Sequence, residues 1–265
     1  GYEGQLWTQA IRNEYPNMKF VGEVWGNDPG IIAYWLGDKQ KQNGFASHLP
    51  MAMVFPLERS LVMGLASDNE AWGGSTKAIY NMIAQDFLYE DAGGSLVVFA
   101  DNHDMSRIYN MLGKDIRKVK QAMTFITTTR GLPQIYYGTE LLFSDDSRGG
   151  AHQCRMDFPG GWKGDMINLF HTEERTNLQQ EMFAHTRNLL HFRKNNSVVY
   201  EGKLMHYVPR NNVYTYFRYN DSECVMIVIN GASQPQKIDW KRFEERLSSK
   251  SEGVNILTGE RIRKG

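Results

Sequence analysis

The apolar run SLVVFA (residues 95–100) passes without a break into the polar run DNHDMSR (residues 101–107). A continuous, β-branched apolar run is typical of a strand buried on both faces, as the strands of parallel sheets are. Three further short segments, residues 18–25, 48–55 and 134–138, also have strand character and stand between segments of helical periodicity. Strands that alternate with helices predict parallel βα units, so we expect an α/β fold for this part of the chain.

Helical periodicity covers residues 2–15, 31–36, 57–65, 76–89, 116–129 and 178–195. Ser75 precedes the fourth of these segments and is its predicted N-cap, because a serine side chain can accept a hydrogen bond from a first-turn amide. The spacing of apolar residues places Met82, Phe87, Phe125 and Ile126 in the predicted core.

After residue 198 the pattern changes to short alternating segments, at residues 203–208, 213–219, 224–231, 237–240 and 254–259. Turn residues such as Asn211-Asn212 and Asn220-Asp221 separate them. This pattern predicts a small all-β antiparallel module. We therefore expect two domains, at residues 1–196 and 197–265, with the boundary near Asn195–Val198.

Composition excludes several classes of function. The 30 Lys and Arg residues balance 30 Asp and Glu residues, so the chain lacks the positive charge that a nucleic-acid binder needs. It has no run of about 18 apolar residues, so no membrane span is expected, and its first residues do not resemble a signal peptide. Two cysteines form no metal pattern, and we interpret them as buried free thiols. Aromatic residues make up 12% of the chain, which suits a large core as well as a sugar site.

Polar residues follow three of the predicted strands, where functional groups of parallel βα proteins lie. Glu23 ends the first strand, Asp101 to Asp104 follow the third, and Tyr136, Tyr137 and Glu140 belong to the fourth. Two carboxylates that face one another across such an edge are the arrangement that glycoside hydrolysis requires. Each carboxylate alone has a structural alternative, which is to cap a helix or to bind loop amides.

Three of these segments resemble motifs of the α-amylase family (glycoside hydrolase family 13). FADNHDMSR (residues 99–107) resembles its strand-seven motif, VGEVW (21–25) its strand-five motif and GLPQIYYGTE (131–140) its strand-eight motif. RMDFPGGW (155–162) and NILTGE (255–260) resemble the neopullulanase or cyclomaltodextrinase branch. The resemblance implies the C-terminal half, strands 5–8, of a (β/α)8 TIM barrel, followed by a small antiparallel β-sandwich domain.

The resemblance also implies roles for individual residues. Glu23 would be the general acid/base, which must be protonated to donate to the leaving oxygen, and Asp104 would stay ionised to stabilise the transition state. His103, helped by Asn102, would hydrogen-bond the sugar in the −1 subsite. Asp101 and Arg107 are expected to be structural, as are Gly138 and Glu140. The acceptor side would be lined by Trp25, Tyr137, Arg155 and Trp162, for each of which core packing is an equal alternative.

The family's nucleophile does not appear where the resemblance would place it. The family supplies it from strand four in a Gly-x-Arg-x-Asp pattern, and no such pattern occurs in the 22 residues before Glu23. We therefore expect this chain to be part of a longer protein, to bind sugar weakly and to lack turnover by itself. Four parallel strands leave two open edges, so the missing N-terminal half of the barrel or a second copy is an expected partner.

The expected function is that of a retaining α-glucan hydrolase acting on α-1,4- and, as a further option, α-1,6-glucosidic bonds of oligosaccharides or starch. Two alternatives stay open: a non-catalytic glucan-binding or assembly fragment, and a transglycosylase on the same scaffold. The chemistry requires no cofactor. Asp145, Asp146 and Asp165 would be the carboxylates to test for calcium, although their spacing is not that of an EF-hand. The family resemblance favours a periplasmic or secreted protein, and the sequence leaves the location open.

Overall fold

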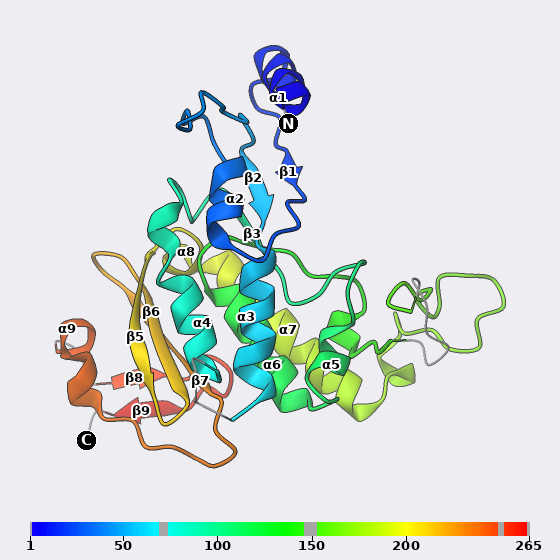
Figure 1. Ribbon diagram of the computed structural model, residues 1–265. Coiled ribbons are helices and arrows are strands. Elements are labelled where there is room, and N and C mark those ends of the chain that lie inside the picture. Colours follow the sequence, from blue (N-terminus) through cyan, green and yellow to red (C-terminus); the bar gives the residue numbers. More distant parts are fainter. Residues whose placement is uncertain (1, 69–73, 146–152, 249–251, 264–265) are drawn as a thin grey trace.

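A parallel sheet of four strands, in the order β1-β2-β3-β4, forms the centre of the computed structural model (Figure 1). The structure describes residues 2–68, 74–145, 153–248 and 252–263. The strands are β1 (Val21–Gly22), β2 (Met51–Met53), β3 (Leu96–Val98) and β4 (Leu132–Pro133). The α-helices of this region are α1 (Tyr2–Glu14), α2 (Pro29–Trp35), α3 (Phe55–Ala66), α4 (Thr76–Ile83), α5 (Ile108–Met111), α6 (Ile116–Thr128), α7 (Asn177–Asn195) and α8 (Ser197–Tyr200). The expected alternation of parallel strands and helices is confirmed.

The two faces of this sheet are covered unequally. Leu96 and Val98 of β3 point into the main core, which they share with residues of α3, α4 and α6. Val97 and Phe99 point to the other face, where, among the described residues, they belong to a small apolar cluster that includes Phe55. The edge strands are short and half open, since Val21 of β1 is 50% exposed and Leu132 of β4 is 43% exposed. The sheet therefore has one complete face, one thin face and two free edges.

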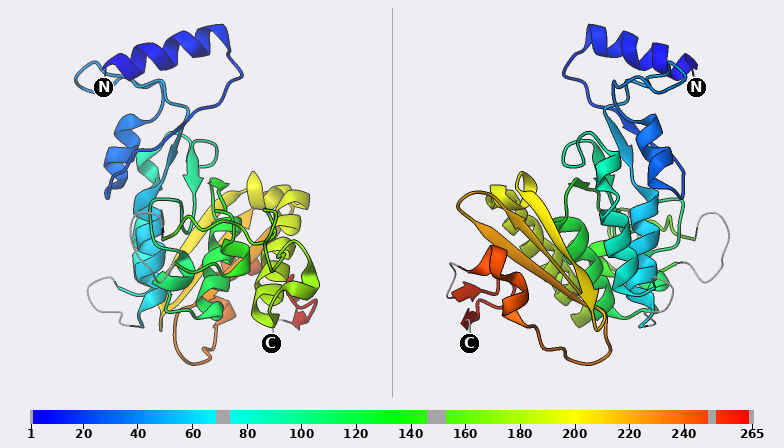
Figure 2. Two further views of the ribbon diagram at one scale, coloured as in Figure 1. Left: turned by 90° about the vertical axis from the view of Figure 1, so that its right-hand side faces the viewer. Right: turned by 60° about the vertical axis from the view of Figure 1, so that its left-hand side comes forward.

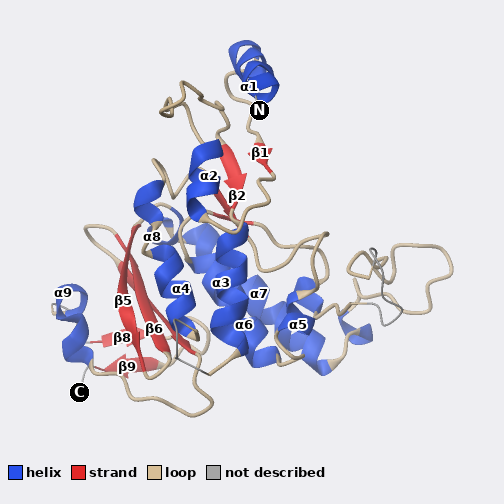
Figure 3. Ribbon diagram, viewed as in Figure 1, coloured by secondary structure: helices blue, strands red, loops and turns tan. Residues whose placement is uncertain are grey.

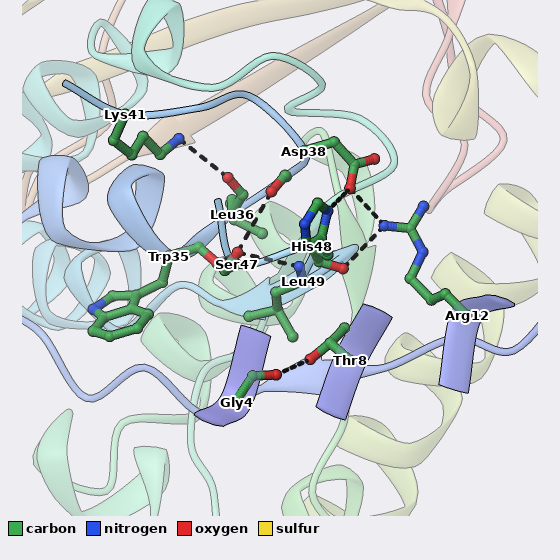
Figure 4. A network of polar contacts seen from close by, with 11 residues as sticks. Gly4, Thr8, Arg12, Trp35, Leu36, Asp38, Lys41, Ser47, His48 and Leu49 are labelled. Atoms are coloured by element: carbon green, nitrogen blue, oxygen red, sulfur yellow. Dashed lines mark hydrogen bonds and ion pairs between the residues drawn. The ribbon is translucent and has the colours of Figure 1, made fainter. Parts of the chain in front are cut away.

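Helix α1 stands away from the body of the molecule, as Figure 2 shows. A polar network ties it to the segment between α2 and β2 (Figure 4). The carboxylate of Asp38 accepts hydrogen bonds from Arg12 of α1 at 2.7 Å and from His48 at 2.8 Å. Arg12 also donates to the carbonyl of His48 at 3.0 Å. These contacts lower the pKa of Asp38, and Arg12 makes the largest contribution.

A three-stranded antiparallel sheet follows, built from β5 (Lys203–Arg210), β6 (Val213–Tyr219) and β7 (Cys224–Asn230). It lies beside α4 and shares the main core through Tyr214 and Tyr216, which are fully buried (Figure 3). The hydroxyl group of Tyr216 is hydrogen-bonded to Thr128 at the end of α6. The last elements are η5 (Trp240–Phe243), α9 (Glu244–Leu247), β8 (Glu252–Val254) and β9 (Arg261–Arg263).

The N-terminus of α4 shows how the two parts of the chain are joined. Ser75 is the residue before the helix, as predicted, but its side chain makes no capping bond. Instead, Oδ1 of Asn212, in the turn between β5 and β6, accepts a hydrogen bond of 2.9 Å from the Thr76 amide. The capping group therefore comes from a residue 136 positions away, which local sequence does not indicate.

Several predicted elements differ from the structure. The last parallel strand is Leu132–Pro133, so residues 134–138 form the loop after it. Residues 237–240 lead into the 3-10 helix η5, and residues 254–259 form most of the turn between β8 and β9. Phe243 of η5 packs against Phe217 of β6, and β8 and β9 pair as a separate two-stranded sheet. Phe87 was predicted in the core and is 81% exposed, because α4 ends at Ile83 and Phe87 falls in the 3-10 turn η2 (Asp86–Leu88).

The described residues also bear on the expected absence of a membrane span and on the state of the two cysteines. None of their helices combines the length and the apolar character needed to cross a membrane. Cys154 is buried, Cys224 is partly buried, and no disulfide joins them.

A buried carboxylic acid lies in the first turn of α3. Glu58 is 8% exposed, and burial raises its pKa to about 7, with a smaller upward contribution from Asp101 that Arg59 opposes. The folded chain therefore takes up a proton at this side chain between about pH 4.5 and pH 7, where the unfolded chain does not. It follows that the free energy of unfolding falls as the pH rises through this range.

The free energy of unfolding of the Glu58→Gln variant does not depend on the proton at this side chain. We therefore expect the variant to gain about 2–3 kcal/mol of stability relative to the unmodified chain when the pH is raised from 5 to 8. Urea unfolding followed by circular dichroism at both pH values measures this difference. Glu201→Gln, at an exposed glutamate, is the matched control and should give the same difference at both pH values. An E58Q effect that does not change with pH would contradict the assignment of a buried, proton-binding carboxyl group.

Candidate active site

The ends of β1 and β3 bring three side chains of the predicted site together. Glu23 follows β1, and His103 and Asp104 follow β3. One imidazole nitrogen and one oxygen of each carboxylate lie within 4.8 Å of one another, and all three residues are exposed. Nε2 of His103 is 3.3 Å from Oδ2 of Asp104. Because parallel strands end at one edge of a sheet, residues 80 positions apart in the chain face the same solvent-filled space.

The turn after β3 is built by two buried neighbours of this group. Asp101 is 2% exposed, and its carboxylate accepts hydrogen bonds from the Ile108 amide at 2.9 Å and from the Thr139 hydroxyl at 2.8 Å. Burial raises the pKa of Asp101 to about 6, although both hydrogen bonds oppose the increase. Asn102 is 1% exposed, and its Oδ1 accepts a 2.8 Å bond from the Asp104 amide. The structural role predicted for Asp101 is confirmed, and Asn102 shapes the turn that presents Asp104.

Arg107 fixes the same turn to the loop after β4. Its guanidinium donates to the carbonyl of Tyr137 at 2.6 Å and lies 4.1 Å from the centre of the Tyr136 ring. The side chain is 1% exposed, so it does not reach solvent. The prediction that Arg107 binds a nearby carbonyl or carboxylate is confirmed.

A glycine makes the loop after β4 possible. Gly138 has φ +82°, and a Cβ there would come within 2.2 Å of the Phe143 ring. The glycine therefore meets two requirements, a left-handed backbone and close ring packing. Glu140 in the following turn is partly buried, and burial raises its pKa. Both residues have the architectural place that the sequence predicted.

The loop between β4 and α7 returns to the turn after β3. Arg155 forms an ion pair with Asp104, and its Nε donates to the carbonyl of His103 at 2.8 Å. Sγ of Cys154 lies 3.1 Å from the same carbonyl oxygen. The family resemblance implies a place for Arg155 on the acceptor side, and its contact with Asp104 is not indicated by the sequence. The two residues are 51 positions apart, and no spacing in the sequence indicates such a pair.

The aromatic residues proposed for the acceptor side have different surroundings. Trp25 is 56% exposed, and its ring centre is 4.4 Å from that of Phe55. Tyr137 is 38% exposed, and its hydroxyl donates to the carbonyl of Met156, next to Arg155. Trp162 is 68% exposed, and no hydrogen bond or ring contact within the described ranges joins it to Glu23, His103 or Asp104. Trp25 and Tyr137 are thus near the strand ends, while Trp162 is an exposed residue of the loop between β4 and α7.

The carboxylates considered for calcium bind loop amides. Asp145 accepts a hydrogen bond from the Arg107 amide at 2.8 Å. Asp165 accepts from the amides of Gly160 at 2.7 Å and Trp162 at 3.1 Å. Asp146 lies outside the described residues.

Comparisons with known proteins agree with this architecture. Residues 4–187 match the family profile described as "Alpha amylase, catalytic domain", and residues 204–264 match "Cyclo-malto-dextrinase C-terminal domain". The chain is 24% identical over 220 residues to a maltogenic α-amylase of Bacillus acidopullulyticus, covering 81% of this chain and 32% of that protein. It is 24% identical over 265 residues to a cyclomaltodextrinase of Geobacillus thermopakistaniensis, covering 97% of this chain and 39% of that protein. The chain thus spans about a third of the length of these relatives.

Solved structures show the same fold. An α-amylase from Anoxybacillus superposes with a TM-score of 0.76 at 18% identity, over 100% of this chain and 52% of the other. The α-amylase of Geobacillus thermoleovorans, solved with acarbose, gives a TM-score of 0.74 at 20% identity, over 98% of this chain and 52% of the other. Because the catalytic-domain profile covers more than half of the residues, the chain belongs to the α-amylase family of glycoside hydrolases, with relatives among the maltogenic amylases and cyclomaltodextrinases.

Proposed function

We propose that this chain forms strands five to eight of the (β/α)8 barrel of an α-glucan hydrolase, at residues 1–196, followed by its C-terminal β domain at residues 197–265. The open edges at Val21 and Leu132 support this proposal, because a closed barrel has no free edges. The coverage of 52% of two α-amylase structures supports it as well. The partner that completes the barrel is its N-terminal half, which would pair with β1 and β4.

The single observation that carries the proposed chemistry is the grouping of Glu23, His103 and Asp104 within 4.8 Å. Glu23 acts as the general acid that protonates the leaving glycosidic oxygen, and then as the base that activates water. Asp104 stays ionised and stabilises the positive charge that develops on the sugar ring. His103 donates a hydrogen bond to a sugar hydroxyl. Trp25 and Tyr137 offer aromatic faces to neighbouring glucose rings.

The reaction we propose retains the anomeric configuration, as the family resemblance implies. It requires a nucleophilic carboxylate about 5 Å from the general acid. That carboxylate comes from the other half of the barrel, so the chain by itself binds glucan weakly and does not turn it over. Solved relatives were crystallised with maltose, maltotriose and acarbose, which supports α-glucans as the substrate class.

A transglycosylase is the second candidate, because a cyclomaltodextrin glucanotransferase of Paenibacillus macerans is 39% identical over 133 residues, or 48% of this chain. Both reactions share the first step and differ in whether water or a sugar hydroxyl attacks the intermediate. Analysis of the products formed from maltoheptaose by the completed barrel distinguishes them. Chains longer than seven glucose units, or cyclic products, indicate transfer, whereas only shorter linear products indicate hydrolysis.

Isothermal calorimetry tests the sugar site of the chain by itself. We expect maltoheptaose to bind with a Kd of about 1 mM or weaker, because half of the contacts are missing. Replacing the exposed His103 by Ala should remove the heat signal, whereas replacing His171, an exposed histidine outside the site, should not. If the His103→Ala variant bound maltoheptaose as tightly as the unmodified chain does, the placement of the sugar beside His103 would be wrong. Turnover of an aryl maltoside by the unmodified chain would contradict the proposal that the nucleophile comes from the other half of the barrel.

The role of Glu23 is tested in the barrel completed by the coding sequence upstream of Gly1. We expect Glu23→Gln to lower kcat on maltoheptaose by at least about 10²-fold, because the leaving oxygen then receives no proton. The loss in the glycosylation step should be much smaller for a 4-nitrophenyl glycoside, whose leaving group does not need protonation. Stopped-flow release of 4-nitrophenol measures that step, with Glu201→Gln as the control. Equal losses on both substrates would rule out the proton-donating role.

A further inference from the structure

Arg155 contacts two neighbouring groups of the turn after β3. Its Nε donates to the carbonyl of His103 at 2.8 Å, and its Nη2 is paired with Oδ1 of Asp104. The other oxygen of Asp104, Oδ2, faces Nε2 of His103 at 3.3 Å. The carboxylate of Asp104 is therefore held between two groups, each of which meets a different oxygen, and its plane is fixed from both sides.

The backbone around Arg155 is anchored to the same place. The Cys154 thiol lies 3.1 Å from the carbonyl oxygen of His103, and the carbonyl of Met156 accepts a hydrogen bond from the hydroxyl of Tyr137. Residues 154–156 thus make contacts with the loops after β3 and β4. These contacts hold the backbone on both sides of Arg155, from which its side chain extends to Asp104.

Stability does not account for this arrangement. The side chains of Arg155 and Asp104 are 41% and 34% exposed, and exposed ion pairs contribute little to the free energy of folding. A direct contact of Arg155 with sugar, as the sequence suggested, would compete with two contacts that the side chain already makes. What the geometry does supply is a preferred orientation for the Asp104 carboxylate.

We propose that Arg155 is a positioning residue, which holds the Asp104 carboxylate beside a positive charge and orients it toward the site. The proposal rests on the function proposed above for Asp104. Its physical basis, the charge and the contacts of Arg155, does not depend on that function, and the experiment below needs neither sugar nor turnover. Failure of the proposed hydrolase activity and failure of this inference are therefore distinguishable.

The test is an NMR titration of the histidine side chains, in which His103→Gln identifies the signal of His103 among the seven histidines of the chain. Among the described residues, Glu23 and Asp104 are the acidic groups beside the imidazole, and Arg155 is bonded to Asp104 and to the backbone carbonyl of His103. Replacing Arg155 by Met removes a positive charge and leaves Asp104 to pair with His103. A unit charge at roughly 6 Å in water shifts a titration midpoint by about half a pH unit. We therefore expect the His103 midpoint to rise by about 0.5 pH unit or more.

Arg175 provides a matched control on the same loop. Its Nε donates to the carbonyl of Leu169 at 2.7 Å, and its guanidinium lies 4.1 Å from the centre of the Phe183 ring. We expect Arg175→Met to lower the thermal stability without moving the His103 midpoint. Arg155→Lys, which keeps the charge, should give a midpoint between those of the unmodified chain and the Arg155→Met variant.

Thermal unfolding followed by circular dichroism shows that each variant is folded at the temperature of the titration. If Arg155→Met does not fold, the comparison of Arg155→Lys and Arg155→Gln replaces it, with the higher midpoint expected for Gln. An unchanged His103 midpoint in the neutral variant, or an equal change in Arg175→Met, would overturn the proposal.

Discussion

The buried carboxylate of Asp101 is the interaction on which the candidate site depends. It lies at the end of β3 and binds an amide of α5 and the hydroxyl of Thr139, beyond β4. Arg107 joins the same two loops through the carbonyl of Tyr137. Because these groups are buried, removing one partner would leave a polar group without water or protein to bind. These buried contacts hold the backbone of the turn, and this backbone places the exposed His103 and Asp104.

The four polar residues after β3 are divided by burial into two kinds. Asp101 and Asn102 point inward and build the turn, whereas His103 and Asp104 point outward and can meet a ligand. The sequence predicted this cluster because an apolar strand ended in it. The motif resemblance assigned Asn102, like His103, to sugar binding, whereas the Asn102 side chain is buried in the turn and accepts a hydrogen bond from the Asp104 amide. Parallel strand ends also explain why Glu23 belongs to the same group. These parts of the site follow from local pattern and from the topology of βα units.

Other parts could not be predicted, because they depend on contacts between residues that are distant in the chain. Asn212 caps α4, where Ser75 had been expected to do so, since the backbone of Ser75 has φ +58° and its side chain makes no capping bond. Arg155 reaches Asp104 across a loop whose path no periodicity describes. Phe87 has the spacing of a core residue but lies beyond the end of its helix. In each case local pattern identified the residue type, and tertiary contacts decided what it touches.

Because the sheet is open, the side chains of the site can lie close together while their surroundings remain exposed to solvent. Glu23 directly follows the edge strand β1 and is exposed. A carboxylic acid that donates a proton near neutral pH works best in surroundings of low polarity. Neighbours on the far side of β1 would exclude water from Glu23, cover Val21 and bring the second carboxylate that retention requires. Closing the barrel would then complete the hydrophobic interior and the active site in one step. On the function proposed above, this chain would carry the acid and the stabilising carboxylate, and the rest of the barrel would supply the environment in which they react.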